Sequence, residues 1–136
     1  MFNMVMVAIG GGIGTLARYL VSGLDYNKYS SGVFPFGTLV VNLSGSFIIG
    51  LLWGLSERFY LSPNVRIFIF IGVLGGYTTF STLSLETFNL LRNNEYRVAF
   101  LNIFLSNFVG IALVLTGFMI SRYLIKLFDL TPGLKG

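Results

Sequence analysis

The stretch Gly75-Gly76-Tyr77-Thr78-Thr79-Phe80-Ser81-Thr82 decides how the third long apolar segment of this chain folds. It lies near the middle of residues 67–91, a segment long enough for a membrane-spanning helix. Two adjacent glycines followed by β-branched and hydroxyl residues make a poor helix centre, so the stretch predicts a break. A break frees main-chain amides and carbonyls, which a membrane tolerates only inside protein or beside a cavity. The alternative is a close helix crossing at the glycines, with the hydroxyls bonding back to i−4 carbonyls.

Three further apolar segments flank this one, at residues 2–24, 36–55 and 98–123. Hydrophobic residues make up 54% of the 136 residues and charged residues 10%, and the mean hydropathy is +0.81. A soluble domain of this size cannot bury so much apolar surface. We therefore predict an all-α integral membrane protein with one four-helix domain over residues 1–136. The first segment is expected to be retained rather than cleaved, because Met1 to Met6 holds no basic residue and no small-x-small site follows.

Several function classes are disfavoured by what the chain lacks. It has no histidine and no cysteine, which removes the usual general base, thiolate nucleophiles and disulfides, so an enzyme is not expected. Gly12 to Ala17 fits a dinucleotide-binding fingerprint, but no acidic residue follows at the required distance. The basic residues are scattered rather than clustered, so no nucleic-acid partner is expected.

Small and polar residues recur at four-residue steps inside the segments. The stripes are Gly10 and Gly14; Thr38, Asn42, Ser46, Gly50 and Gly54; and Asn102, Ser106 and Gly110. Small residues let membrane helices approach closely, so the glycines are explained by packing alone. The amides are less well explained, because polar groups inside a span need partners and often mark a path for something polar.

The basic residues give no clear orientation in the membrane. With four spans, five fall on one side and four on the other: Arg58, Arg66, Arg122, Lys126 and Lys135 against Arg18, Lys28, Arg92 and Arg97. Lys and Arg in short loops normally set orientation, so a balanced count permits insertion both ways and an antiparallel dimer. The alternative is that one charge, such as Arg58, fixes a single orientation.

Three motifs resemble those of the Fluc-type (CrcB) fluoride ion channel family. They are Gly10 to Tyr19 (GGGIGTLARY), Pro35 to Asn42 (PFGTLVVN) and Gly75 to Thr82 (GGYTTFST) followed by Glu86. The resemblance implies an antiparallel, dual-topology homodimer in the bacterial plasma (inner) membrane. It also implies passive export of cytoplasmic fluoride through two pores at the dimer interface.

The same resemblance implies roles for individual residues. It places the pore on Asn42, Phe80, Ser81, Thr82 and Ser106, with Thr38 nearby, and a structural Na⁺ at the dimer centre on the carbonyls of Gly75 and Thr78. Amide and hydroxyl groups are donors that replace water around fluoride, and an aromatic ring has a positive edge. Membrane lipid, fluoride and a second copy are therefore the expected partners.

Three further expectations concern positions where the pattern is less regular. Leu83 stands where many family members carry a second phenylalanine, which puts a two-ring pore in doubt. Asn102 is a candidate for a pore role that the family often gives to a tyrosine. Arg18 and Glu86 lie toward ends that emerge on the same side, and we expect them to approach each other or to bracket a vestibule.

Two other functions remain to be weighed against the channel. A proton-coupled exporter of small ions or drugs would need a carboxylate deep in the bundle, and Glu86 is the candidate. A purely structural helper subunit would leave the amides and the predicted break without a purpose.

Overall fold

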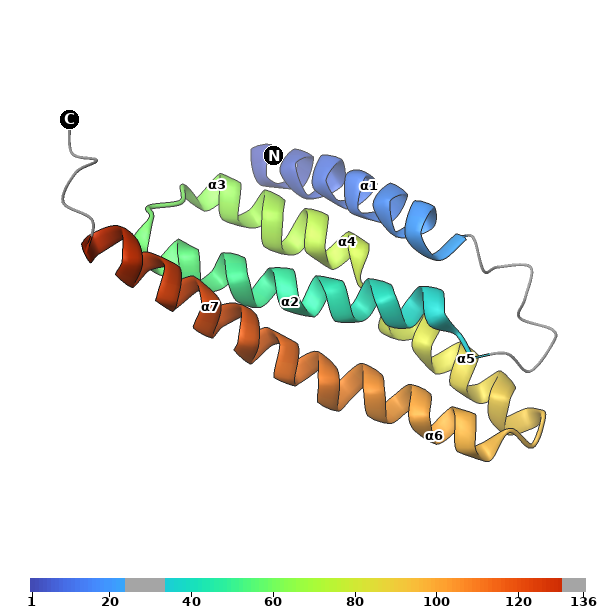
Figure 1. The fold of residues 1–136 in the computed structure, drawn as a ribbon. Coiled ribbons are helices and arrows are strands. Elements are labelled where there is room, and N and C mark those ends of the chain that lie inside the picture. The colour runs from blue at the N-terminus through green and yellow to red at the C-terminus, as the bar shows by residue number, and fades with distance from the viewer. Residues whose placement is uncertain (24–33, 131–136) are drawn as a thin grey trace.

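The computed structural model describes residues 1–23 and 34–130, and this part of the chain is helical without strands (Figure 1). The elements are α1 (Phe2–Ser22), α2 (Phe36–Arg58), α3 (Pro63–Arg66), η2 (Ile67–Leu74), α4 (Gly75–Tyr77), α5 (Phe80–Arg92), α6 (Tyr96–Phe104), η3 (Leu105–Val109) and α7 (Gly110–Leu130). They join into four spans long and apolar enough to cross a membrane, at residues 2–22, 36–58, 63–92 and 96–129.

The ends of the helices differ from the predicted bounds by a few residues. The second span continues to Arg58 rather than stopping at residue 55, and the fourth runs from Tyr96 to Leu130 rather than over 98–123. The predicted second span ended before Glu57 and Arg58 and the predicted fourth span began after Arg97, but both helices include these charged residues. The third span starts at Pro63 rather than residue 67, because the Ser62 side chain caps it and Pro63 occupies its first turn.

The predicted break in the third span is confirmed at Thr78 and Thr79. Thr78 has φ −78° and ψ 155°, and Thr79 has φ −148° and ψ 122°, so both residues are extended. The helix restarts at Phe80, where the Thr79 hydroxyl accepts a hydrogen bond from the Thr82 amide at 3.3 Å and acts as the cap. The hydroxyl of Thr78 donates back to the Leu74 carbonyl at 3.0 Å. The alternative interpretation is confirmed for the close helix crossing at Gly76 and for one hydroxyl, but the helix is interrupted as well.

Glycines bring the first span against the half of the third span that precedes the break. A methyl group added to Gly10 would lie 2.7 Å from the Phe68 carbonyl oxygen, and one added to Gly76 would lie 2.6 Å from that of Gly11. A methyl group on Gly14 would collide with the Val73 carbonyl. The backbones of α1 and of η2 and α4 are thus in direct contact, as small residues allow in membranes.

The second and fourth spans form the other closely packed pair, and α2 and α7 run side by side in Figure 1. The small-residue stripe of α2 has different contacts at its two ends. Near the C-terminal end of α2, Gly50 and Gly54 pack on Val114 and Ser121 of α7. Near the N-terminal end, Thr38 bonds to Glu86 and Asn42 bonds to Thr79, both in the third span. The stripe therefore serves packing at one end and polar contacts at the other.

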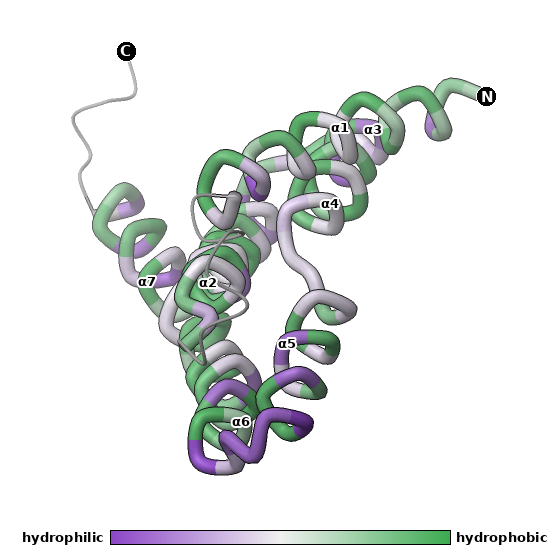
Figure 2. The backbone as a smooth tube through the Cα atoms, turned by 90° about the vertical axis from the view of Figure 1, so that its right-hand side faces the viewer, coloured by the Kyte–Doolittle hydropathy of each residue, from purple (hydrophilic) through white to green (hydrophobic). Residues whose placement is uncertain are grey.

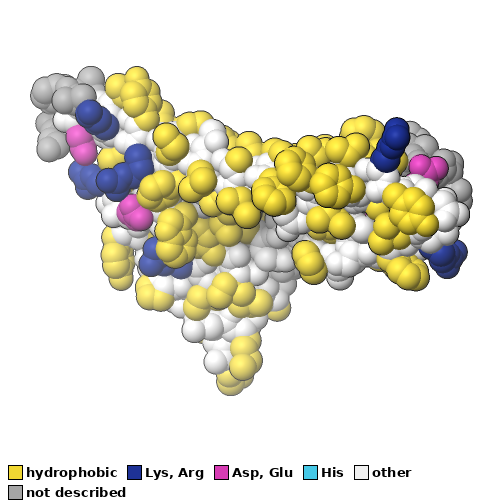
Figure 3. Space-filling model, turned by 90° about the horizontal axis from the view of Figure 1, so that it is seen from below, with side chains coloured by type: hydrophobic (Ala, Val, Ile, Leu, Met, Phe, Trp, Pro, Cys, Tyr) yellow, Lys and Arg dark blue, Asp and Glu magenta, His cyan; other side chains and the backbone are white. Residues whose placement is uncertain are grey.

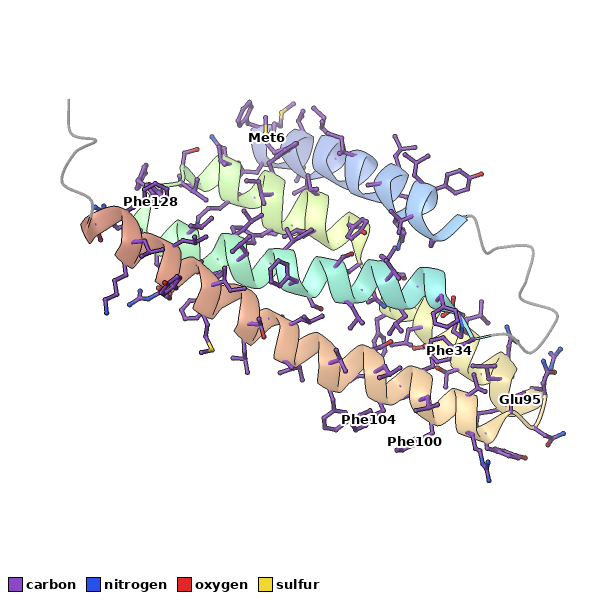
Figure 4. The ribbon with its side chains drawn as sticks, viewed as in Figure 1. Met6, Phe34, Glu95, Phe100, Phe104 and Phe128 are labelled. Atoms are coloured by element: carbon purple, nitrogen blue, oxygen red, sulfur yellow. The ribbon has the colours of Figure 1, made fainter. Side chains whose placement is uncertain are left out.

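The surface has the character of a protein immersed in lipid. Large apolar side chains are exposed along all four spans, including Leu16, Trp53, Ile71 and Phe108. Figure 2 shows hydrophobic residues along the length of the helices and hydrophilic ones gathered toward their ends. Figure 3 shows the same division on one face, with charged side chains at the two ends and apolar ones between them. In Figure 4, Phe100 and Phe104 project away from the bundle, while Glu95 lies at the α5–α6 turn.

Candidate functional site

The main feature of the candidate site is a pair of hydrogen bonds between Asn42 and the break. The Asn42 amide nitrogen donates to the Thr79 carbonyl oxygen at 3.0 Å. The Thr79 main-chain N–H donates to the Asn42 amide oxygen at 2.8 Å. One side chain of α2 therefore satisfies both main-chain groups of an extended residue that a helix would otherwise pair. This fixes the Asn42 amide, so one of its two N–H groups is used by the protein and one remains for a ligand.

A cavity of about 330 Å³ lies on one side of the break. We call it the break cavity; its walls include Asn42, Gly75, Thr78, Phe80, Leu83 and Ser106. Phe80 is 75% exposed and Leu83 is buried. Five residues predicted for the pore or the cation therefore share one hollow.

A second cavity of about 370 Å³ lies on the other side, and we call it the outer cavity. Its walls include Arg18, Thr38, Thr79 and Thr82. Thr79 lines both cavities, so the two are separated by the extended residue that Asn42 holds. The break is therefore in contact with both cavities, and each cavity has hydroxyl groups in its walls.

Thr38 connects the outer cavity to Glu86. Its hydroxyl donates to a Glu86 carboxylate oxygen at 2.5 Å, and both side chains are buried. Arg18 lines the same cavity as Thr38. Thr38 thus contacts Glu86 and shares a cavity with Arg18, while an approach of Arg18 to Glu86 stays a prediction. Because the Thr38 proton points to Glu86, this hydroxyl is not a free donor in the structure.

The remaining hydroxyls differ in what they already bind. The hydroxyls of Ser81 and Thr82 lie 3.3 Å and 3.0 Å from that of Thr79. The Ser106 hydroxyl is buried and has no hydrogen-bond partner among the residues that the structure describes. Ser106 belongs to η3, a π-helical turn, and such turns are frequent at functional sites. Its hydroxyl is therefore the donor in the break cavity with the most freedom to bind a ligand.

Asn102, the candidate for an extra pore role, is fully buried and donates to the Thr87 hydroxyl at 3.2 Å. It joins α6 to α5 and lies outside the walls of both cavities.

Two features of the site were missed from the sequence. The first is the pair of hydrogen bonds between the Asn42 side chain and the main chain of Thr79. The available signal for it was the amide side chain in the second span. The second is a hydroxyl pair, Ser44 with Tyr77 at 2.9 Å, which ties α4 to α2 just before the break. Its signal was a tyrosine at the end of a half-helix, two residues from Thr79.

The predicted cation residues fit a site made of main-chain oxygens. In a continuous helix the Thr79 N–H would bond to the Gly75 carbonyl, four residues earlier. Here the Thr79 N–H bonds to Asn42 instead. The Gly75 carbonyl therefore does not receive the hydrogen bond that a continuous helix would give it. The C-terminal end of a half-helix carries partial negative charge and attracts cations. Gly75 and Thr78 both line the break cavity.

Comparison with known proteins identifies the family of this chain. The sequence pattern of the family described as CrcB-like protein, Camphor Resistance (CrcB), matches residues 5–118. The chain belongs to the CrcB family. The matched region includes every residue of the break cavity and the outer cavity.

Similar CrcB relatives carry the name fluoride-specific ion channel FluC. One from Desulfotalea psychrophila is 45% identical over 120 residues, covering 88% of this chain and 92% of the relative. One from Pyrococcus abyssi is 48% identical over 119 residues, covering 87% and 94%. One from Geobacter metallireducens is 46% identical over 125 residues, covering 91% and 100%. The likeness therefore extends over nearly the whole of each chain.

Proposed function

We propose that this chain is a passive, fluoride-selective channel that carries fluoride out of the cell. The observation that carries the proposal is the break at Thr79, held by Asn42, with Thr79 in the walls of two cavities that each contain a few hydrogen-bonding side chains. The names of the relatives supply the ion. We further propose the bacterial plasma membrane as its location.

The donor chemistry of the site supports an anion with a strong hydration shell. Asn42 has one N–H left after binding Thr79, and Ser106 has a hydroxyl in the same cavity. Ser81 and Thr82 add hydroxyls around Thr79. Such groups replace water without a fixed full charge, and conduction requires sites that bind strongly enough to admit the ion and weakly enough to release it. Phe80 adds the positive edge of a ring.

We propose that two copies assemble antiparallel, with two pores at their interface. Phe80 supports this, because it is three-quarters exposed in a single copy although it lines the break cavity. The near-equal numbers of basic residues on the two sides support insertion in both orientations. A second copy would give the exposed ring a protein neighbour and close the cavity.

We propose a structural Na⁺ on the Gly75 and Thr78 carbonyls. Unwound carbonyls at half-helix ends are the ligands that transporters use for Na⁺. When bound, the ion would supply fixed positive charge next to the break. The protein's own residues do the rest: Asn42 holds the peptide of Thr79, and Tyr77 and Ser44 hold the end of α4.

The test is fluoride efflux from liposomes that contain the purified protein, followed with a fluoride electrode. A potassium ionophore sets the voltage. A channel gives efflux that follows voltage, ignores a pH gradient, is lost in Asn42→Asp and falls about tenfold in Phe80→Ile. Absence of fluoride efflux from well-folded protein would contradict the proposal.

A proton-coupled exporter is the second candidate, and the burial of Glu86 favours it. Glu86 is 3% exposed, whereas the other carboxylates that the structure describes, Glu57, Glu95 and Asp129, are exposed. The same liposomes separate the two functions. An exporter requires a pH gradient and loses transport in Glu86→Gln.

A further inference from the structure

The charged end of the α2–α7 pair carries a cavity that neither the channel proposal nor the family motifs use. It measures about 660 Å³ and is lined by Glu57, Arg58, Arg122, Tyr123, Ile125, Lys126 and Asp129. We call it the charged cavity. It lies at the end of α2 and α7 that is at the left in Figure 1, and Figure 3 shows charged side chains gathered at that end.

Two exposed ion pairs connect the two helices at the charged cavity. Arg122 of α7 bonds to Glu57 of α2 at 3.0 Å, and Arg58 of α2 bonds to Asp129 of α7 at 3.3 Å. A guanidinium has five N–H donors, and each of these arginines uses one nitrogen in its pair. The pairs therefore orient both arginines and leave most of their donors available.

The charge of the cavity is unbalanced by one. Arg58, Arg122 and Lys126 give three positive charges, and Glu57 and Asp129 give two negative ones. Lys126 is exposed and takes part in neither ion pair. A ligand with a single negative charge would neutralise the lining.

An apolar track on α7 leads along the helix to the same cavity. Ile111, Leu115, Met119 and Tyr123 recur at four-residue steps, and each is more than half exposed. The stripe runs for about 18 Å along the helix at 1.5 Å per residue. This is close to half of the ~30 Å hydrocarbon core, the depth that one lipid leaflet occupies. Tyr123 belongs to both the track and the cavity.

We propose that the charged cavity binds the phosphodiester headgroup of an anionic phospholipid, with one acyl chain lying on the α7 track. Basic pockets between membrane helices near one membrane surface are known to suit such headgroups. A monoanionic lipid would neutralise the one unbalanced positive charge and would also cover the apolar track, which is about one leaflet deep. A free anion would neutralise the charge but would leave the track uncovered. The proposal depends on the membrane location and not on fluoride transport.

The test is native mass spectrometry of the full-length protein, mixed in detergent with equal amounts of dioleoylphosphatidylglycerol and dioleoylphosphatidylcholine. The wild type is expected to retain phosphatidylglycerol preferentially. Lys126→Gln should reduce that preference by about fivefold, which corresponds to about 1 kcal/mol per basic residue near an anionic surface. The matched control is Arg97→Gln, which removes an exposed charge at the other end of the bundle and should leave the preference unchanged.

Three results would overturn the proposal. One is equal retention of the two lipids by the wild type, and another is the same loss of preference in Arg97→Gln as in Lys126→Gln. The third is a thermal unfolding midpoint that inorganic phosphate raises as much as phosphatidylglycerol does. In that case the occupant of the charged cavity is free phosphate. Because Lys126 is exposed, Lys126→Gln should fold, and its midpoint without added lipid checks this. Fluoride efflux measured in parallel keeps a failure here distinct from a failure of the channel proposal.

Discussion

Replacing Asn42 by leucine removes the partner of both main-chain groups of Thr79. Thr79 is buried, and the side chain of leucine can neither donate nor accept a hydrogen bond. A buried polar group that loses its partner costs about 1–3 kcal/mol. Two such groups give an expected loss of about 2–6 kcal/mol in the free energy of unfolding. Asn42→Asp should lose less stability, because a carboxylate still accepts from the Thr79 N–H although it cannot donate to the carbonyl.

The assay is unfolding in mixed micelles by increasing dodecyl sulfate, followed by circular dichroism. Asn107→Leu is the matched control, because the Asn107 amide also lines the break cavity but donates to Ile103 in its own helix. The Ile103 carbonyl lies within a helix, so its loss of the Asn107 amide should lower the free energy of unfolding of the control by at most about 1 kcal/mol. The reasoning fails if Asn42→Leu is no less stable than Asn107→Leu.

Three further outcomes are expected. Phe80→Ile should lower fluoride efflux by about tenfold, which corresponds to about 1.4 kcal/mol. Phe88 is another exposed ring on α5, and Phe88→Ile should leave the efflux rate unchanged. Equal effects of the two substitutions would show that Phe80 is not a pore residue. Gly14→Ala should destabilise the protein by about 1–3 kcal/mol through overpacking. Gly12→Ala should not, because its added methyl group meets nothing within 4 Å. The unfolding midpoints of the two variants measure the difference. Glu86→Gln should keep efflux independent of a pH gradient if the chain is a channel, and a pH-dependent rate in the wild type that disappears in the variant would favour the exporter.

The four spans and the break could be predicted because their causes are local. A span needs about 20 apolar residues in a row, and adjacent glycines followed by Thr78 and Thr79 weaken a helix wherever they occur. The packing roles of Gly10, Gly14 and Gly50 followed from the same kind of reasoning, since a small residue in a membrane helix usually marks a close neighbour.

The partners of the polar residues could not be predicted, because they depend on how the spans are arranged. Thr38 and Asn42 belong to one stripe, yet one bonds to a carboxylate of α5 and the other to the main chain at the break. Asn102 was considered for an additional pore role, and its amide instead joins α6 to α5. Spacing along one helix gives the face on which a residue lies, but the residue opposite it comes from tertiary structure.

The pairing of Asn42 with Thr79 has a consequence for how the third span tolerates change. A side-chain amide here imitates a neighbouring strand over a single residue, so it recognises one peptide group and no other. In any helix, an inserted residue changes both the angle and the axial position of the residues that follow it. One residue inserted into η2 would present a different peptide to Asn42, while the glycines that seat this half-helix on α1 would lose their register at the same time. Length in this segment is therefore under tighter constraint than composition, and apolar substitutions there should be accepted far more readily than insertions or deletions.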